Sequence, residues 1–260
     1  MLAYERHGTG PPLVLLHGLG HRRQGWNALL PLLTADRTVI AVDLPGHGDS
    51  PPLVADGGHA VQAMAEEVFG FFGELGLDRP HVAGNSLGGA LALMAGANGL
   101  ASTVTGLSPA GFWAHRWELR YTKAIFVSAQ VVGQVARPLV PALVRSPAGR
   151  HVIDGAFLNR PSRMPAEQAL GDSAAFLRAR DAVYAVLADG ITFTQSVPAD
   201  VPVTIAWGAK DRMLPPRQAR GARQRLPHAT FVALPGCGHV PMTDDPALVA
   251  RVLLDGSDAG

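Results

Sequence analysis

The sequence predicts an α/β fold with a mostly parallel sheet, and three observations support this prediction. Several short apolar runs lie between polar or glycine-rich turns, as expected for strands that are buried on both faces. Segments with apolar residues at helical spacing alternate with these runs. The 260 residues are 47% hydrophobic, which is enough for one sizeable core, and no segment is typical of a linker between independent domains.

The expected elements follow in order along the chain. The first residues lead directly into a strand, and the other strands are expected at 13–16, 38–42, 81–83, 103–107, 201–207 and 230–234. Helices are expected at 26–33, 59–75, 87–97, 216–226 and 246–254.

Residues 110–195 interrupt this alternation. They contain no recognisable strand, and their helix-like segments are broken by prolines. We therefore expect a core formed by residues 1–109 and 196–260, with a helical insertion at 110–195. The aromatic residues of the insertion fit either a small core of its own or a lid, because ligands in open α/β sheets bind beyond the carboxyl ends of the strands.

A serine in a G-x-S-x-G frame is the most informative local pattern. Ser86 lies between Gly84 and Gly88, after an apolar strand and before a small-residue helix. This order is typical of a nucleophile elbow, in which a sharp turn strains the serine backbone and glycines remove the Cβ atoms that would collide. We expect the Ser86 hydroxyl to face a substrate.

A serine nucleophile needs a base, and the base needs a carboxylate that fixes its tautomer. Asp211 follows the strand at 201–207, and His239 follows the next strand after two glycines. We expect these two residues to complete a catalytic triad. Three other aspartates compete for the acid role, but they fit turns or helix caps better: Asp43, Asp244 and Asp245.

Acyl transfer also requires donors for the oxyanion, usually backbone amides. We expect one from Leu87, the residue after the nucleophile, and one from Leu19 in the glycine-containing loop after the strand at 13–16. Glycines after a strand are also ordinary turn residues. Two separate loops that meet the same requirement favour the oxyanion interpretation.

Charge and cysteine content limit the partners and the compartment. The chain has 22 basic and 21 acidic residues, and no basic block that would favour nucleic acid. A single cysteine, Cys237, excludes an internal disulfide, gives no metal-ligand spacing and fits a small apolar role better than catalysis. No signal peptide or bilayer-spanning run is recognisable, so we expect a cytoplasmic protein.

Five motifs together resemble the α/β-hydrolase superfamily, and they cover nearly the whole chain outside the insertion. They are His17-Gly18-Leu19-Gly20, the stretch Asp43 to Ser50, Gly84-Asn85-Ser86-Leu87-Gly88-Gly89, Trp207 to Asp211, and Gly238-His239. The resemblance implies an eight-stranded mostly parallel sheet flanked by helices, a helical cap and no cofactor. It does not fix the substrate.

The function expected from these features is hydrolysis of a small to medium carboxylic ester with apolar character. The elbow is similar to that of meta-cleavage C-C hydrolases, although those enzymes commonly carry tryptophan after the catalytic histidine, where this chain has Val240. A non-catalytic ligand receptor and cofactor-free perhydrolysis are further alternatives. Residues near the triad loops or after the strand at 103–107 are expected to line the substrate pocket: Gly18, Phe112, Trp113, Trp117, Met213 and Val240.

Overall fold

A seven-stranded sheet forms the centre of the computed structural model, which describes residues 1–55 and 59–258. Its strand order is β1-β3-β2-β4-β5-β6-β7, and only β1 is antiparallel, pairing with β3 at one edge. The strands are β1 (Tyr4–His7), β2 (Pro12–Leu16), β3 (Thr38–Val42), β4 (His81–Asn85), β5 (Thr103–Leu107), β6 (Val203–Gly208) and β7 (Thr230–Leu234). The described residues thus form seven strands, where eight were expected.

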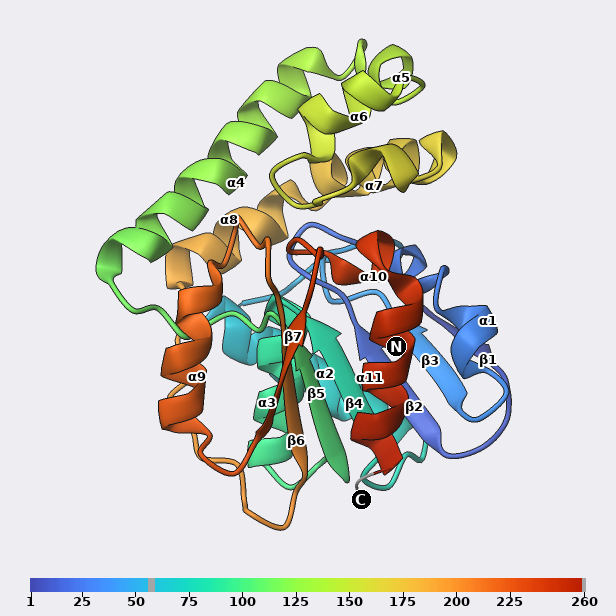
Figure 1. Cartoon of the computed structure of the whole chain (residues 1–260), viewed down its shortest axis with the longest axis vertical. Helices are drawn as coiled ribbons and strands as arrows, with labels where there is room; N and C mark the ends of the chain where they lie inside the picture. The colour runs from blue at the N-terminus through green and yellow to red at the C-terminus, as the bar shows by residue number, and fades with distance from the viewer. Residues whose placement is uncertain (56–58, 259–260) are drawn as a thin grey trace.

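Helices cover both faces of the sheet and rise above one end of it (Figure 1). Those that belong to the core are α1 (Leu30–Leu33), α2 (Ala60–Glu74), α3 (Leu87–Ala97), α9 (Ala219–Arg225), α10 (Pro241–Asp244) and α11 (Pro246–Asp258). Short 3₁₀ turns are η1 (Arg23–Trp26), η2 (Pro161–Arg163) and η3 (Pro216–Gln218).

Prolines explain where the observed elements depart from the expected ranges. The helix expected at 26–33 is a 3₁₀ turn followed by the single turn α1, with Pro31 in its first turn. A proline is tolerated there because its missing N–H would have no intrahelical partner. Likewise β6 begins at Val203, since Pro202 can offer the sheet only its carbonyl, which accepts from the Val104 amide at 2.9 Å.

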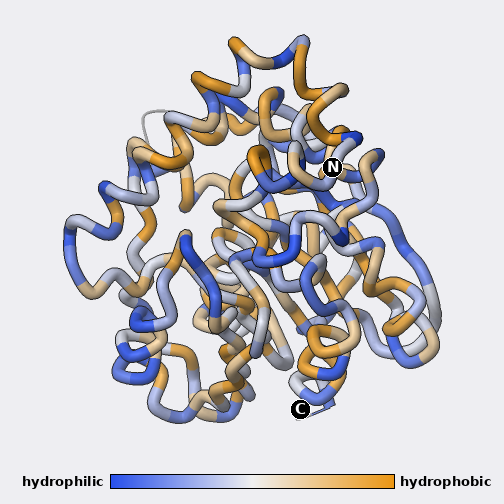
Figure 2. The backbone as a smooth tube through the Cα atoms, turned by 45° about the horizontal axis from the view of Figure 1, so that its top comes forward, coloured by the Kyte–Doolittle hydropathy of each residue, from blue (hydrophilic) through white to orange (hydrophobic). Residues whose placement is uncertain are grey.

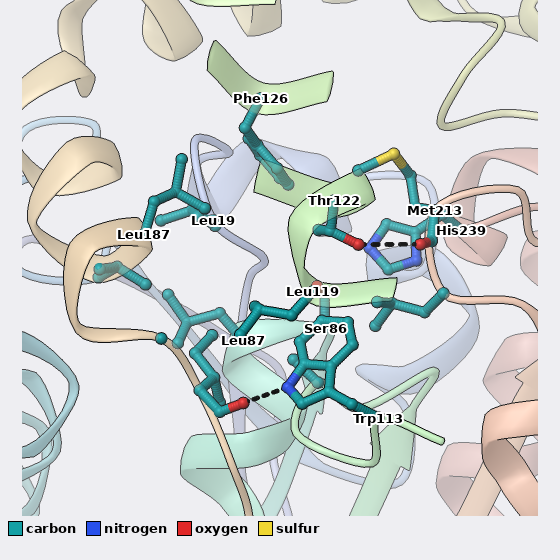
Figure 3. Close-up of a pocket in the computed structure, with 15 residues that line it drawn as sticks. Leu19, Ser86, Leu87, Trp113, Leu119, Thr122, Phe126, Leu187, Met213 and His239 are labelled. Carbon is teal, nitrogen blue, oxygen red and sulfur yellow. Dashed lines mark hydrogen bonds between the residues drawn. The ribbon is translucent and has the colours of Figure 1, made fainter. Parts of the chain in front are cut away.

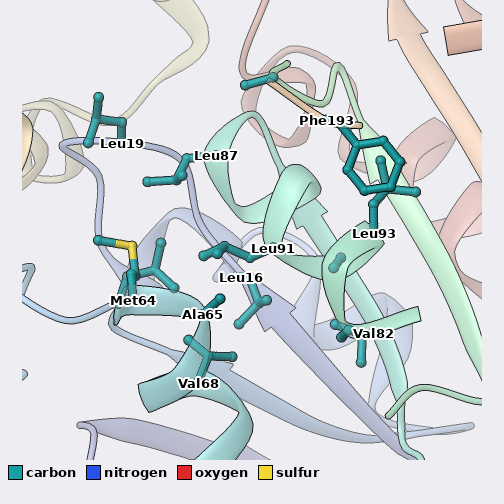
Figure 4. Close-up of a cluster of buried hydrophobic side chains, with 14 of the residues drawn as sticks. Leu16, Leu19, Met64, Ala65, Val68, Val82, Leu87, Leu91, Leu93 and Phe193 are labelled. Atoms are coloured by element: carbon teal, nitrogen blue, oxygen red, sulfur yellow. The ribbon is translucent and has the colours of Figure 1, made fainter. Parts of the chain in front are cut away.

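The two faces of the sheet are filled by alternate residues of the same strands. In β2, Val14 and Leu16 pack on the side of α2 and α3, while Leu13 and Leu15 pack on the side of α1 and α11. Figure 4 shows the first of these clusters, in which Leu16 and Val82 of the sheet meet residues of α2 and α3. Burial on both faces accounts for the nearly continuous apolar runs of the sequence.

The regular elements within residues 110–195 are all helices, and we call them the cap helices. They are α4 (Arg116–Ala136), α5 (Val140–Leu143), α6 (Pro147–Asp154), α7 (Ala166–Arg178) and α8 (Arg180–Asp189), with η2 between α6 and α7. In Figure 1, α5 and α6 are farthest from the sheet, and α8 lies nearest to it. The cap helices stand over the sheet edge at which the parallel strands end.

Strand register brings the loops after β2, β4, β6 and β7 to the carboxyl ends of the parallel strands. Leu16 of β2 pairs with Gly84 of β4, and Asn85 pairs with Leu107 of β5. Gly208 of β6 pairs with Leu234 of β7. The segments that follow β2, β4, β6 and β7 therefore leave the sheet at the same edge, beneath the cap helices.

Candidate active site

Ser86 occupies a strained turn between β4 and α3. Its φ of 55° and ψ of −114° lie outside the common regions for a residue with a side chain. A Cβ on Gly84 would lie 2.2 Å from the carbonyl oxygen of Gly88, and a Cβ on Gly88 would lie 2.1 Å from that of Leu16. The two glycines of the motif are therefore required by the close approach of strand, turn and helix.

Asp211 and His239 form a buried hydrogen-bonded pair. His239 Nδ1 lies 2.8 Å from Asp211 Oδ2, and both side chains are almost fully buried. The other carboxylate oxygen, Oδ1, accepts from the amides of Met213 at 2.9 Å and Leu214 at 2.8 Å. Because an ionised carboxylate only accepts, Nδ1 carries the proton, which leaves Nε2 of His239 free to act as a base.

The loop that carries His239 is fixed by two residues for which the sequence predicts no such role, Asn85 and Asp244. Asn85 Nδ2 donates to the carbonyl of His239 at 2.9 Å and to that of Leu107 at 3.0 Å. Asp244 accepts from the amide of Gly238 at 2.7 Å. The residue before Ser86 and the end of α10 thus hold the histidine loop from two sides.

The same loop is also tied to the cap helices. The amides of His239 and Val240 donate to the carbonyl of Phe157, at 2.7 and 3.2 Å. Asp244 accepts from the amides of Asn159 at 3.0 Å and Arg160 at 2.6 Å. The segment between α6 and η2 therefore forms part of the support of His239.

Two buried histidines hold the loop after β2. His17 donates through Nδ1 to the Gly18 carbonyl at 2.8 Å, and its Nε2 accepts from the Leu44 amide at 3.0 Å. His47 Nε2 accepts from the Gly20 amide at 3.0 Å, while Nδ1 donates to the Pro45 carbonyl at 2.9 Å. Each ring therefore needs one unprotonated nitrogen.

Burial keeps both rings neutral. It lowers the pKa of His47 to about 4 and holds the pKa of His17 well below its usual value, with the neighbouring His47 adding to the effect on His17.

Leu19 and Leu87, whose amides were expected to face the oxyanion, both contribute to the wall of the small cavity that also contains Ser86 and His239. Leu87 is the first residue of α3, where backbone amides have no acceptor within the helix. A Cβ on Gly18 would lie 3.4 Å from Ser86 Cβ, so the loop carrying Leu19 passes close to the elbow.

The competing aspartates have other partners. Asp43 Oδ1 accepts from the Arg23 amide at 2.6 Å, and its Oδ2 accepts from the Asp49 amide at 3.0 Å. Asp245 Oδ1 accepts from the Leu248 amide at 3.0 Å, which is an N-cap of α11. Cys237 is buried, and burial together with the charges of Asp244 and Asp245 raises its pKa to about 11, which opposes a nucleophilic role.

Two cavities of unequal size meet at Ser86 and His239. The smaller has a volume of about 30 Å³ and extends toward Trp113, Leu187 and Met213 (Figure 3). Its wall is fixed by hydrogen bonds from Trp113 Nε1 to the Ile191 carbonyl and from Thr122 Oγ1 to the Met213 carbonyl.

The larger cavity has a volume of about 620 Å³ and lies beneath α4, α6 and α7. Its lining is mostly apolar, with Phe126, Phe157 and Phe176 among the large side chains. The acidic residues that line it are Asp154 and Asp172. Burial, followed by the charge of Asp172, raises the pKa of Asp154 to about 7.

Four of the expected pocket residues border these cavities and two do not. Trp113 and Met213 line the small cavity, and Gly18 and Val240 line the large one. Phe112 and Trp117 line neither cavity.

Phe112 is buried in the core against Phe193, with ring centroids 5.6 Å apart. Trp117 is on α4, and its side chain is exposed. The Arg217 guanidinium lies 4.9 Å from the centroid of its ring.

Within residues 1–55 and 59–258, no three His, Cys, Asp or Glu side chains are grouped so that they could hold a metal ion. Over the same residues, no helix combines the length and the apolar character needed to cross a membrane.

The sequence of residues 13–252 matches the model of the alpha/beta hydrolase family. Because the match covers most of the chain, the protein belongs to this family.

The chain is also similar to two curated proteins and one solved structure. A pimeloyl-[acyl-carrier protein] methyl ester esterase of Aeromonas hydrophila is 27% identical, with 97% of each chain covered. The dihydrolipoyllysine-residue acetyltransferase component of an acetoin cleaving system of Pseudomonas putida is 30% identical, but only 59% of its length is covered, against 89% of this chain. A membrane phospholipase A, described as a bacterial virulence factor, is 28% identical with a TM-score of 0.77, covering 100% of this chain and 84% of its own.

Proposed function

We propose that this protein is a serine hydrolase that cleaves a small to medium carboxylic ester with apolar character through an acyl-enzyme. The observation that carries the proposal is that Ser86 and His239 line the same cavities, with His239 joined to Asp211 at 2.8 Å. Among members of a family with many activities, the local chemistry of the site decides the proposed reaction.

The proposed reaction begins when His239 Nε2 takes the hydroxyl proton of Ser86 as the serine oxygen attacks the ester carbonyl. The amides of Leu19 and Leu87 stabilise the oxyanion. His239 then protonates the leaving alcohol and later activates the water that releases the acid. Asp211 keeps the proton on Nδ1 and stabilises the charged imidazolium.

The unequal cavities support an ester with one short and one long side. A volume of about 30 Å³ accommodates a group of one or two carbon atoms, whereas about 620 Å³ of mostly apolar space accommodates a long chain. The names of two similar proteins support this substrate class: one acts on a methyl ester, and the other is a phospholipase.

The test is hydrolysis of p-nitrophenyl esters and methyl esters of the same acids, from short to long acyl chains, by the wild type and Ser86→Ala. We expect the variant to lose at least three orders of magnitude in kcat with an unchanged melting temperature. The matched control is Ser128→Ala, which removes a hydroxyl from the cavity wall on α4 and should retain turnover.

Other outcomes would replace the proposal. Ester turnover that survives in pure Ser86→Ala would exclude Ser86 as the nucleophile. Turnover of a vinylogous diketone acid without any ester cleavage would identify a C-C hydrolase. Peroxide-dependent turnover of an acid would identify a perhydrolase, and stable ligand binding without conversion would identify a receptor.

A further inference from the structure

Exposed apolar side chains are concentrated on the cap helices. In the part of the chain that the structure describes, the large hydrophobic residues exposed outside residues 110–195 are scattered: Met1, Leu32, Val54 and Leu100. Those within 110–195 are Trp117, Tyr121, Val127, Val131, Val132, Val135, Leu139, Val152 and Leu170. Single exposed hydrophobic residues are ordinary, but a concentration on one part of the molecule indicates an interaction surface.

The outward face of α4 is apolar toward its end. Val127, Val131 and Val135 are four residues apart, so they share one helix face, and their exposed fractions rise from 38% to 54% and 80%. Leu139 continues this surface beyond the helix and is 62% exposed. A helix of this kind normally carries polar residues on its outward face. Figure 2 shows hydrophobic stretches that reach the outermost turns of the cap.

This apolar surface is continuous with the opening of the large cavity. Val132 on α4 is 63% exposed and Val152 on α6 is 79% exposed, and both also line the cavity. The same cavity reaches Ser86 and His239. A ligand that enters between α4 and α6 therefore passes exposed aliphatic side chains before it reaches the candidate triad.

The segment that carries this surface is positively charged. Residues 119–153 contain no aspartate or glutamate, but they contain five basic residues: Arg120, Lys123, Arg137, Arg145 and Arg150. Arg137 and Arg145 are exposed. Arg150, in contrast, is buried and donates to the carbonyls of Val144 and Ser162. Over the whole chain the net charge is only +1, so this segment is more basic than the chain as a whole.

We propose that the apex of the cap, formed by Val131, Val135, Arg137, Leu139 and Arg145, docks on an anionic lipid surface. Aliphatic side chains beside arginines match the apolar boundary and the negative headgroups of such a surface. The lipid ester then leaves the surface through the opening between Val132 and Val152. This inference rests on the proposed function for its substrate, but the docking itself does not require catalysis.

The chemistry of the apex favours a lipid surface over a second copy of the chain. A symmetric pairing through this surface would oppose arginines with arginines, and residues 119–153 offer no acid to pair with them. Valine and leucine are also not the aromatic anchors typical of protein interfaces.

The test is co-sedimentation of the full chain, carrying Ser86→Ala to prevent hydrolysis, with vesicles of phosphatidylcholine containing phosphatidylglycerol. We expect binding that weakens when salt is raised and that is lost on vesicles of phosphatidylcholine alone. Adding Arg137→Gln and Arg145→Gln should weaken binding about 25-fold, at about 1 kcal/mol for each arginine. Adding Val135→Ser and Leu139→Ser should weaken binding at least tenfold.

Matched controls come from outside the cap. Leu32→Ser with Val54→Ser removes two exposed aliphatic side chains, and Arg6→Gln with Arg251→Gln removes two exposed arginines. Neither pair should change vesicle binding. In the protein that retains Ser86, the pair Val135→Ser and Leu139→Ser should leave turnover of a soluble short-chain ester unchanged, since neither residue belongs to the cavity wall.

Several results would overturn the docking proposal. Absence of vesicle binding would do so, as would equal binding by cap variants and controls. Concentration-dependent self-association that the cap substitutions abolish would assign the surface to a second copy instead. If the protein binds vesicles but cleaves no ester, the docking stands and the proposed function fails.

Discussion

The loops at the sheet edge and the cap helices above them are held in different ways. The loops are fixed by buried hydrogen bonds with defined partners, such as those of His17, His47, Asn85 and Asp244. The cap encloses a large apolar cavity and leaves valines of α4 exposed. Under the proposed function, the chemistry would lie in the hydrogen-bonded loops, and the shape that selects a substrate would lie in the cap helices.

Among the tests of this difference between loops and cap, we expect the largest change in turnover from Asp211→Asn. The amide keeps the size of the side chain but cannot fix the Nδ1–H tautomer of His239, so kcat should fall about 10⁴-fold. Ester hydrolysis at saturating substrate measures it. Asp245→Asn, at the N-cap of α11, should retain full turnover; an equal loss in both variants would contradict the assignment.

Asp244→Ala should destabilise the protein by about 3 kcal/mol. It leaves the buried amide of Gly238 and the half-buried amides of Asn159 and Arg160 without their acceptor. Urea unfolding measures the loss, with Asp245→Ala as the control at about 1 kcal/mol. If the two variants are equally stable, Asp244 does not join the histidine loop to the cap.

Acid should destabilise the protein through two buried histidines of the loop frame. The folded pKa values of His17 and His47 are lowered, so below about pH 6.5 the unfolded chain binds protons that the folded chain cannot. Stability should therefore fall as pH drops from about 6.5 toward 4, by roughly 1 kcal/mol per pH unit for each histidine. Unfolding between pH 7 and pH 5 measures this slope, and His47→Gln should reduce it.

The last effect concerns the cap. The pKa of Asp154 is raised to about 7 in the folded protein, so its ionisation costs stability, and this cost grows from about pH 4 to pH 7. Asp154→Asn should raise stability at pH 8, by roughly 1 kcal/mol per pH unit between those limits, and have little effect at pH 4. Thermal unfolding at pH 4 and pH 8 measures the change in stability, with exposed Asp181→Asn as the control. A gain in stability at pH 4 alone would contradict an effect of Asp154 ionisation.

Local patterns predicted the sheet and the residues of the candidate triad. Apolar runs identified six strands, five of which are buried on both faces, and the glycines around Ser86 indicated the turn. The cap cavity could not be predicted, since helical periodicity does not say which side of α4 meets solvent. Trp117 is an example, because it lies on α4 but lines neither cavity.

The supports of His239 were missed for a related reason. Asn85 and the His239 carbonyl are 154 residues apart in sequence, and no short motif links them. Asp244 resembled a helix cap by its position, and only the folded chain shows that it contacts residues 159 and 160. Such contacts are set by tertiary packing, which a single sequence does not report.

The carbonyl of Phe157, which accepts from both His239 and Val240, limits how this protein can be recombined. An exchange of the whole segment 110–195 with that of a relative would replace a support of the candidate base along with the substrate cavity. Chimaeras that keep residues 157–160 with the parent core and exchange the helices on either side should change selectivity while preserving turnover. If the proposed function holds, the boundary between the residues that support His239 and those that shape the large cavity runs through the inserted segment and does not coincide with its ends.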